Sequence, residues 1–500
     1  MTTEVQRLSP GSAGGGLINQ KIVVAVVYVS SMLMNSIDST IVNVALATLG
    51  RQFNVSAEQI DMVVVSYLVS LAVFIPASGW LGDRFGTKRI FLIALGIFTL
   101  ASAACGLSQS FNELILFRAL QGIGGGMLTP VGMAMLYRAY PPSERVQVSR
   151  ILMLVTIIGP ASGPVLGGFI IEKFSWHWAF YVNVPVGVAG FLFGLLFLHE
   201  SREPEPGRFD LRGFILAGTG FAMFMYALSE GPSRGWMAPD IALTGVIGTV
   251  LLVLFVITEM RVREPLVKLK LLGDHLFRST TIVSLFASAG FMGVLFMMPL
   301  FLQEARGFSP LQSGLATFPE AIGVVTSTQI VARFYPRVGP SRLMAVGLVG
   351  VATMMALLWT IDLNTSVWVV RALMFFIGVG MSYVFLPAQV AAFATISHAD
   401  TGQASTLSSV QRRVGGAVGV AILSSALAAV GATHLSSGGT MQPNITAYHI
   451  SFLVAAALAA IAAIMALRIP DHLAAETMHV ATKRGAGKEA REPLLAAEDD

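Results

Sequence analysis

The chain has 500 residues, of which 54% are hydrophobic and only 12% are charged, whereas soluble domains carry about 25% charged residues. Apolar stretches of roughly 20 residues, long enough to cross a hydrocarbon core as helices, recur from Ile22 to Leu467. This excludes a soluble protein and predicts an all-α integral membrane protein, because backbone in lipid must satisfy its own hydrogen bonds and no alternating strand pattern is present.

The formal charge of +4 does not indicate nucleic-acid binding, because the basic residues fall in short loops between apolar runs, where they set orientation. The single cysteine, Cys105, lies in an apolar run, so we expect no disulfide framework, no cysteine-based metal site and no bound cofactor. No Gly-x4-Gly-Lys-Ser/Thr phosphate loop occurs, so ATP is not the expected energy source. With no metal-ligand cluster and no nucleophile elbow, we do not expect an enzyme.

About fourteen spans are predicted by length and hydropathy. In chain order they are residues 22–49, 58–80, 90–108, 112–137, 147–171, 178–198, 211–230, 239–259, 278–303, 311–332, 342–361, 365–396, 402–430 and 446–468. Weak similarity between the first and last six predicts two six-helix bundles, 22–198 and 278–468, with two inserted helices in the linker 199–277. The segments 1–21 and 469–500 are polar; the second is expected to be disordered from Asp471 onward.

Orientation follows from the loops. If the N-terminus is cytoplasmic, most loop arginines and lysines, such as Arg84, Arg138 and Arg261, fall on the inner side, and the opposite loops carry few. The positive-inside rule therefore predicts a multi-pass protein of a bacterial inner membrane with both termini in the cytoplasm.

One loop, 79–89, combines a tight turn with a cluster of charges: Gly79, Asp83, Arg84, Gly86, Lys88 and Arg89. Glycine permits a sharp reversal of the chain. An acid followed by several bases can form ion pairs in one conformation and lose them in another, which suits a gate. A topology signal with a turn explains the same residues equally well.

Two further patterns lie inside predicted spans. Arg118 occupies an apolar helix, where a charge should face a polar interior or a partner, unless it reaches the nearby interface. Glycines and prolines recur in span 147–171, where they favour close helix contact or a bend; the residues are Gly159, Gly163, Pro164, Gly167 and Gly168.

These three segments, in this order, resemble the signature motifs of the major facilitator superfamily. The segments Asp38-Ser39-Thr40-Ile41-Val42-Asn43 and Trp176-His177-Trp178-Ala179-Phe180-Tyr181-Val182-Asn183-Val184-Pro185 resemble its fourteen-helix drug:proton antiporter branch. The resemblance covers nearly the whole chain and implies a proton-coupled exporter of amphipathic, often cationic, drugs and dyes. His177, Ala47 and Glu320 depart from the usual pattern of that branch, and Glu320 adds a titratable group.

On this basis Asp38, Arg118 and Glu320 are the predicted proton-coupling residues. Asp38 lies near the middle of the first span, where desolvation favours a neutral carboxyl, and Arg118 is expected to be coupled to it. Glu320 follows Pro319 near the middle of its span and is expected to face a central cavity, bonded to substrate or proton, to a neighbour in its own bundle, or to an arginine such as Arg412. Asn35, Tyr67, Gln121, Glu320 and Arg412 form the predicted substrate cavity.

Two alternatives remain open at this level. The cargo could be an endogenous lipid, siderophore or amino acid, or the chain could be a sensor or scaffold that transports nothing. Charges retained within lipid argue against a scaffold. The expected partners are small-molecule drugs or dyes, protons and membrane lipids, with no nucleic acid, and the expected state is a monomer.

Overall fold

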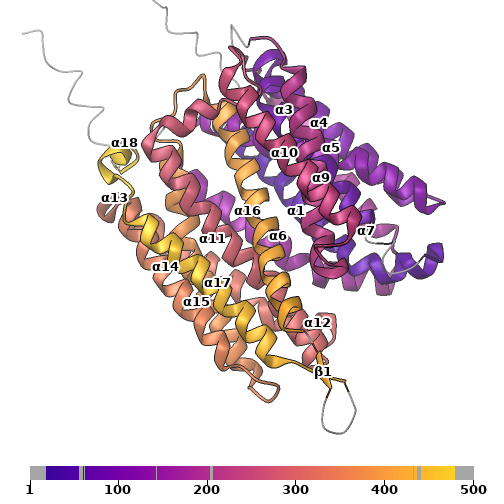
Figure 1. Cartoon of the computed structure of the whole chain (residues 1–500). Coiled ribbons are helices and arrows are strands. Elements are labelled where there is room, and N and C mark those ends of the chain that lie inside the picture. The colour runs from indigo at the N-terminus through magenta and orange to yellow at the C-terminus, as the bar shows by residue number, and fades with distance from the viewer. Residues whose placement is uncertain are drawn as a thin grey trace, which may run out of the picture.

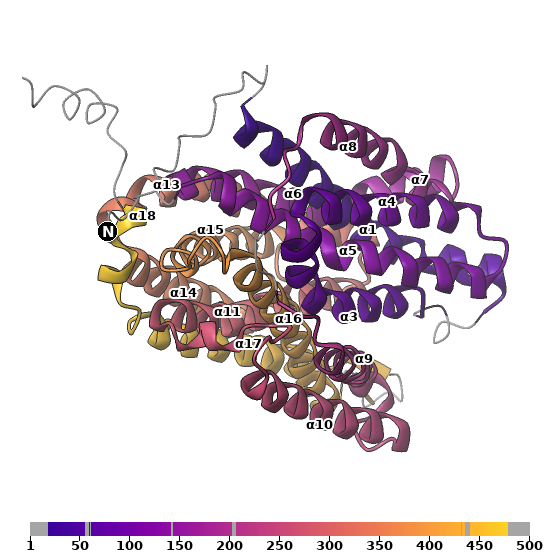
Figure 2. The same ribbon diagram turned by 90° about the horizontal axis from the view of Figure 1, so that it is seen from above.

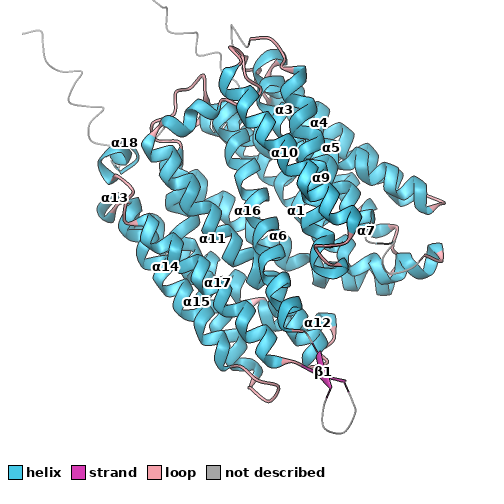
Figure 3. Ribbon diagram, viewed as in Figure 1, coloured by secondary structure: helices cyan, strands magenta, loops and turns pink. Residues whose placement is uncertain are grey.

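Long helices account for most of the computed structural model, which describes residues 19–55, 60, 62–141, 144–202, 207–431, 433–435 and 441–478 (Figure 3). Thirteen helices in this part of the chain are long and apolar enough to cross a membrane. The remaining predicted span, 147–171, lies on a further helix, α6, of 29 residues. The prediction of an all-α membrane protein is therefore confirmed.

The first six spans form one bundle (Figure 1). Its helices are α1 (Gln20–Phe53), α3 (Met62–Phe85), α4 (Thr87–Leu107), α5 (Phe111–Ala139), α6 (Arg145–Lys173), the short α7 (Trp178–Tyr181) and α8 (Asn183–Phe197). Side-chain caps mark helix starts that the sequence encodes: Asn19 accepts from the Lys21 amide before α1, and Ser110 accepts from the Glu113 amide before α5.

The last six spans form the second bundle. Its helices are α11 (His275–Leu300), α12 (Pro310–Thr317), α13 (Pro319–Val338), α14 (Pro340–Leu357), α15 (Val367–Ala392), α16 (Thr401–Val430) and α17 (Ile445–Ala466). A break at Phe318, directly before Pro319, separates α12 from α13. A π-helical turn, Phe301–Ala305, ends α11, and the strands β1 (Thr433–Leu435) and β2 (Met441–Pro443) pair antiparallel beyond α16.

The inserted pair, α9 (Leu211–Arg234) and α10 (Pro239–Arg261), lies to one side of the junction between the bundles (Figure 2). Helix α9 packs against α3 of the first bundle and α16 of the second. On the other side of the molecule α6 of the first bundle packs against α13 and α15 of the second. A 3-10 turn, Leu269–Gly273, then leads from α10 to α11.

The expectation of disorder from Asp471 is wrong for its first eight residues. They form a 3-10 turn, Asp471–Ala474, and helix α18 (Ala475–Met478). Asp471 accepts a 2.7 Å hydrogen bond from the Ser341 amide in the first turn of α14, and the Thr477 and Tyr335 hydroxyls lie 2.9 Å apart. A carboxylate at a helix N-terminus is stabilising, so this polar segment docks. Residues 479–500 and 1–18 lie outside the described part.

Candidate functional site

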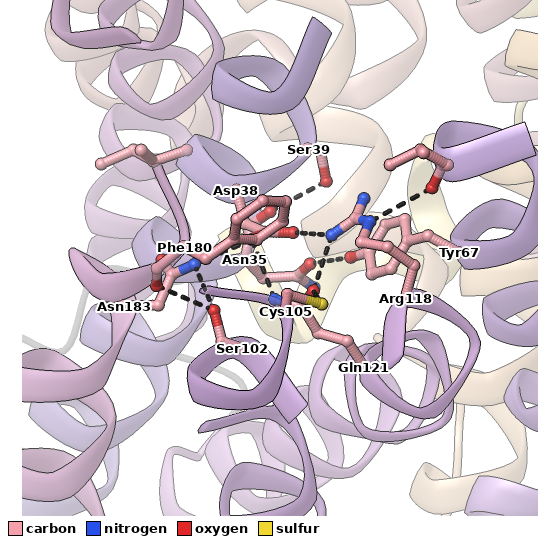
Figure 4. A network of polar contacts seen from close by, with 12 residues as sticks. Asn35, Asp38, Ser39, Tyr67, Ser102, Cys105, Arg118, Gln121, Phe180 and Asn183 are labelled. Carbon is pink, nitrogen blue, oxygen red and sulfur yellow. Dashed lines mark hydrogen bonds and ion pairs between the residues drawn. The ribbon is translucent and has the colours of Figure 1, made fainter. Parts of the chain in front are cut away.

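A polar network in the first bundle centres on Asp38 of α1 and Arg118 of α5 (Figure 4). Arg118 Nη1 donates to Asp38 Oδ2 at 2.8 Å, and the two side chains are 1% and 0% exposed. The guanidinium is therefore held inside the bundle and does not reach the interface. Because an unpaired charge would be very costly there, each partner makes the other tolerable.

Two amides complete the shell around the Asp38 carboxylate. Gln121 Nε2 and Asn183 Nδ2 each donate to Asp38 Oδ1 at 2.8 Å, while Gln121 Oε1 accepts from Arg118 Nη1 at 2.7 Å. Asn183 also donates to the Ser102 hydroxyl at 3.0 Å. Both carboxylate oxygens thus accept from donors of the first bundle.

Two aromatic rings lie beside the Arg118 guanidinium. Its guanidinium carbon lies 4.2 Å from the centre of the Tyr67 ring and 5.9 Å from that of Phe180, within cation–π range. The Tyr67 hydroxyl in turn donates to Asn35 Oδ1, and Arg118 Nε donates to the Val63 carbonyl at 3.2 Å. Arg118 thus uses its planar guanidinium both to donate several hydrogen bonds and to contact aromatic rings.

The structure thus brings together four predicted site residues besides Asp38: Arg118, Gln121, Tyr67 and Asn35 (Figure 4). All five are buried, so Gln121, Tyr67 and Asn35 pack within the Asp38–Arg118 network. Sequence reasoning missed Asn183 and Ser102 as members. Asn183 stands in the Trp176–Pro185 motif, but nothing in that motif signals a partner 145 residues away.

The glycine-rich face of α6 packs directly on α1, the helix that carries Asp38. A Cβ added to Gly159 would lie 2.4 Å from Cβ of Ser36, and one added to Gly163 would lie 1.9 Å from Oγ1 of Thr40. Glycine therefore permits an approach that any other residue would prevent. Gly167 is buried on the same helix, whereas the side-chain environments of Pro164 and Gly168 lie outside what the structure describes.

The charged loop, residues 79–89, is wrong as a loop of that length: α3 extends to Phe85 and α4 starts at Thr87, so only Gly86 lies outside a helix. The segment begins at a contact between the bundles. Arg138 Nη2 of α5 donates to Asp83 Oδ1 at 2.8 Å, and both side chains are largely buried. A Cβ on Gly402, in the first turn of α16, would lie 2.8 Å from Asp83 Oδ1, and one on Gly79 would lie 2.6 Å from Oγ1 of Thr406. Asp83 therefore faces the N-terminus of a helix from the other bundle, where a carboxylate is favoured.

The second half of the loop is fixed by Glu200. Gly86 turns the chain with φ 99°, and the Glu200 carboxylate accepts from the amides of Lys88 at 2.9 Å and Arg89 at 3.3 Å, capping α4. Lys88 Nζ donates to the Leu195 carbonyl at 2.9 Å, and Arg84 is exposed. The ion pair between Asp83 of α3 and Arg138 of α5 thus connects the charged loop to another helix. Arg138 was not predicted as the partner of Asp83.

Further contacts close the same end of the molecule, here called the Asp83 end. Ser405 Oγ of α16 donates to the Pro130 carbonyl of α5 at 2.7 Å. The rings of Tyr137 and Phe393 stack with centres 4.4 Å apart, and Arg145 Nη1 donates to the Phe393 carbonyl. These contacts connect α5 and α6 to α15 and α16, so the two bundles are held together at this end.

Glu320 lies apart from this network, in the first turn of α13 after the break at Phe318. Its side chain is buried, and Oε1 has no hydrogen-bond partner among the described residues. The proposed pairing with Arg412, or with a neighbour in its own bundle, is therefore wrong for Oε1 in this conformation. The Glu320 backbone is fixed against α15, since a Cβ on Gly378 would lie 2.0 Å from the Glu320 carbonyl oxygen.

Arg412 lines a pocket in the second bundle, between α11, α15 and α16. None of Asn35, Tyr67, Gln121 and Glu320 contributes to its lining. The five residues predicted to form one substrate cavity thus fall into three places: the Asp38 network, the start of α13 and the Arg412 pocket.

Comparison with known proteins agrees with this geometry. The family model described as Major Facilitator Superfamily matches residues 28–420. The protein MdtD of Escherichia coli strain K12/DH10B, whose name refers to multidrug resistance, is 34% identical over 440 residues, covering 88% of this chain and 92% of MdtD. MdtD of Pectobacterium carotovorum is 33% identical over 431 residues, 86% of this chain and 92% of the relative.

Two solved structures share the fold at low sequence identity. The human organic anion transporter MFSD10 superposes with a TM-score of 0.64 at 14% identity, covering 89% of this chain and 99% of that one. The proton:xylose symporter XylE gives a TM-score of 0.64 at 16% identity, covering 92% and 99%.

Proposed function

Because the chain belongs to the major facilitator superfamily, and is a multi-pass membrane protein, we propose that it is a proton-coupled antiporter. In this proposal it exports amphipathic drugs and dyes, cationic ones among them, across the bacterial inner membrane by alternating access. The relationship to proteins named for multidrug resistance supports the choice of cargo. The single observation that carries the coupling is the buried Asp38–Arg118 pair.

The chemistry of that pair suits proton exchange. In the conformation described, Asp38 accepts from Arg118, Gln121 and Asn183. Protonation converts one oxygen from acceptor to donor and must break at least one of these contacts. The freed guanidinium would then be a buried charge without its partner, so a proton and a rearrangement of α1 against α5 are energetically linked.

The inter-bundle contacts support alternating access. The Asp83 end is closed by Asp83 facing α16, by Ser405 on Pro130 and by the stacked pair of Tyr137 and Phe393. If the positive-inside rule gives the orientation, this end is cytoplasmic, and the conformation is closed toward the cytoplasm. Transport then requires these contacts to break while Asp38 is protonated, and to form again as its proton leaves.

Everted membrane vesicles provide the test. Respiration acidifies the lumen, and a pH-sensitive dye then reports proton release when a drug or dye is added from the outside. We expect wild-type vesicles to release protons with a cationic dye such as ethidium, and Asp38→Asn vesicles at equal protein level to release none. Asp240→Asn, which breaks an exposed ion pair with Arg234, is the matched control and should behave as wild type. Active efflux by Asp38→Asn at the wild-type rate would overturn the coupling role.

A further inference from the structure

The Arg412 pocket combines an apolar wall with several hydrogen-bonding groups. It has a cavity volume of about 50 Å³, several times what one water molecule requires. Its polar lining includes Ser284 and Ser288 of α11, Gln389 of α15, and Ser408, Gln411 and Arg412 of α16. Apolar packing explains none of these groups, because the surrounding bundle core consists of aliphatic and aromatic side chains.

The pocket carries a positive charge that nothing described neutralises. No carboxylate among the described residues forms an ion pair with Arg412. The groups that act on it electrostatically are the hydroxyls of Tyr28 and Tyr137 and the neighbouring cation of Arg413. A charge inside a membrane bundle normally pairs with an opposite charge or faces a functional pathway. Arg118, in the first bundle, shows the paired case.

Unused hydrogen-bond donors accompany the charge. Gln411 Nε2, on a pocket-lining side chain, is buried without a partner among the described residues, and so is the Tyr28 hydroxyl nearby. Arginine and amide nitrogens offer donors only, and serine hydroxyls can act as donors. A cation or a purely apolar group would leave these donors unsatisfied, whereas an anionic oxygen group accepts from several at once, and charge-assisted bonds of this kind are the strong ones.

We propose that the Arg412 pocket binds the anionic group of a small amphipathic molecule, a carboxylate, sulfonate or phosphate, so that amphipathic acids and zwitterions are ligands of this protein. The proposal rests on the transport function above only for the fate of the ligand, because binding itself requires no gradient. The anionic group bound at Arg412 has two sources, a transported acid or the headgroup of an anionic lipid. The experiment below separates them.

The position of the pocket connects an occupant to the closure of the Asp83 end. Phe393 lines the pocket, stacks on Tyr137 of the first bundle and accepts from Arg145 through its carbonyl. A bound anion therefore lies next to a contact that must break when the Asp83 end opens. An acid seated on Arg412 would be carried on the part of the second bundle that moves relative to the first.

A matched pair of dyes tests the proposal. Rhodamine B carries a xanthylium cation and a carboxylate, and its ethyl ester keeps the cation and loses the carboxylate. Fluorescence anisotropy with the full chain in phosphatidylcholine nanodiscs should show that Arg412→Gln weakens rhodamine B binding about tenfold or more and leaves the ester unchanged. Arg412→Lys should fall between. Arg342→Gln removes the same charge from an exposed residue of the same bundle that does not line the pocket, and should match wild type.

Thermal unfolding of each variant confirms that it is folded. Loss of rhodamine B and ester binding by equal factors, an equal effect of Arg342→Gln, or no binding of rhodamine B to folded wild type would each overturn the anion site. If phosphatidylglycerol in the discs displaces rhodamine B in wild type but not in Arg412→Gln, the occupant is the lipid headgroup; if it does not, the occupant is the acid. A failed proton-release assay combined with Arg412-dependent binding would reject the antiport function and keep this site.

Discussion

Asn183 of α8 and Arg118 of α5 donate hydrogen bonds to different oxygens of the Asp38 carboxylate, Asn183 to Oδ1 and Arg118 to Oδ2, each at 2.8 Å. Three helices of the first bundle therefore converge on one ionisable group. Because a carboxylate binds its donors more strongly than a neutral carboxyl does, the state of Asp38 is coupled to the relative position of α1, α5 and α8.

Replacing Asn183 should slow transport. Asn183→Leu removes one of the three donors to the Asp38 carboxylate and leaves the Ser102 hydroxyl without its amide neighbour. We expect a lower initial rate of proton-driven efflux in vesicles at matched protein level, because hydrogen bonds to a charged group are the strong ones. Asn444→Leu, at a partly exposed site before α17, is the control. A wild-type rate would show that the Asn183 amide is not needed at Asp38.

Arg118→Lys should impair transport although it keeps the charge. Lysine is a point charge without a planar group. It cannot bond Asp38, Gln121 and the Val63 carbonyl together and also stack on the Tyr67 ring, as the Arg118 guanidinium does. We expect at least a tenfold loss of efflux rate, since losing hydrogen bonds between charged groups costs about 1.5–3 kcal/mol. Initial rates in vesicles with matched protein levels measure it. Wild-type rates and pH dependence would contradict the multidentate role.

How far the sequence leads depends on the kind of signal. Charges are rare in apolar helices, so Asp38, Arg118 and Glu320 stand out without a structure. Their partners do not: Gln121, Asn183 and Ser102 are ordinary polar residues, and Arg138 and Glu200 reach the charged loop from 55 and 112 residues away. The pairing of Glu320 with Arg412 could not be judged either, because it depends on where the helix breaks and on how α13 is rotated.

Gly163→Ala should disturb the contact between α6 and α1. The added methyl would lie 1.9 Å from Oγ1 of Thr40, so one helix must shift, and overpacking of this kind costs about 1–3 kcal/mol. We expect a lower thermal unfolding temperature and slower efflux. Thr40→Gly removes Oγ1 and also the Thr40 Cβ, which would lie 2.5 Å away, and should rescue both in the double variant. If the double variant is as impaired as Gly163→Ala, the close approach at Thr40 is not the cause.

Asp83→Asn should slow turnover and retain substrate affinity. The substitution breaks the ion pair with Arg138 and weakens the contact with the first turn of α16, which destabilises the closed Asp83 end relative to the open one. We expect a lower maximal efflux rate. Dye binding in nanodiscs should stay within about twofold of wild type, because the substitution shifts the populations of the open and closed conformations and leaves the binding groups intact. Arg84→Gln, at the exposed neighbour, is the control. Equal losses of affinity and rate in folded protein would rule out a gating role.

Glu320→Gln should weaken export of cationic compounds, divalent ones most, and spare neutral ones. Glu320 follows Pro319 at the start of α13, and its side chain is buried. Oε1 is buried with no partner among the described residues, so no protein cation satisfies it and a cationic substrate can. Coulomb attraction scales with the charge of the substrate, so a bis-quaternary compound loses about twice the interaction energy that a mono-cation loses. The initial efflux rate should therefore stay unchanged for a neutral compound, decrease for a mono-cationic one and decrease most for a divalent one. Glu304→Gln, on an exposed residue of the same bundle, is the control. A uniform decrease across the three compounds would assign Glu320 to proton movement or packing instead, and no decrease would remove it from the transport path.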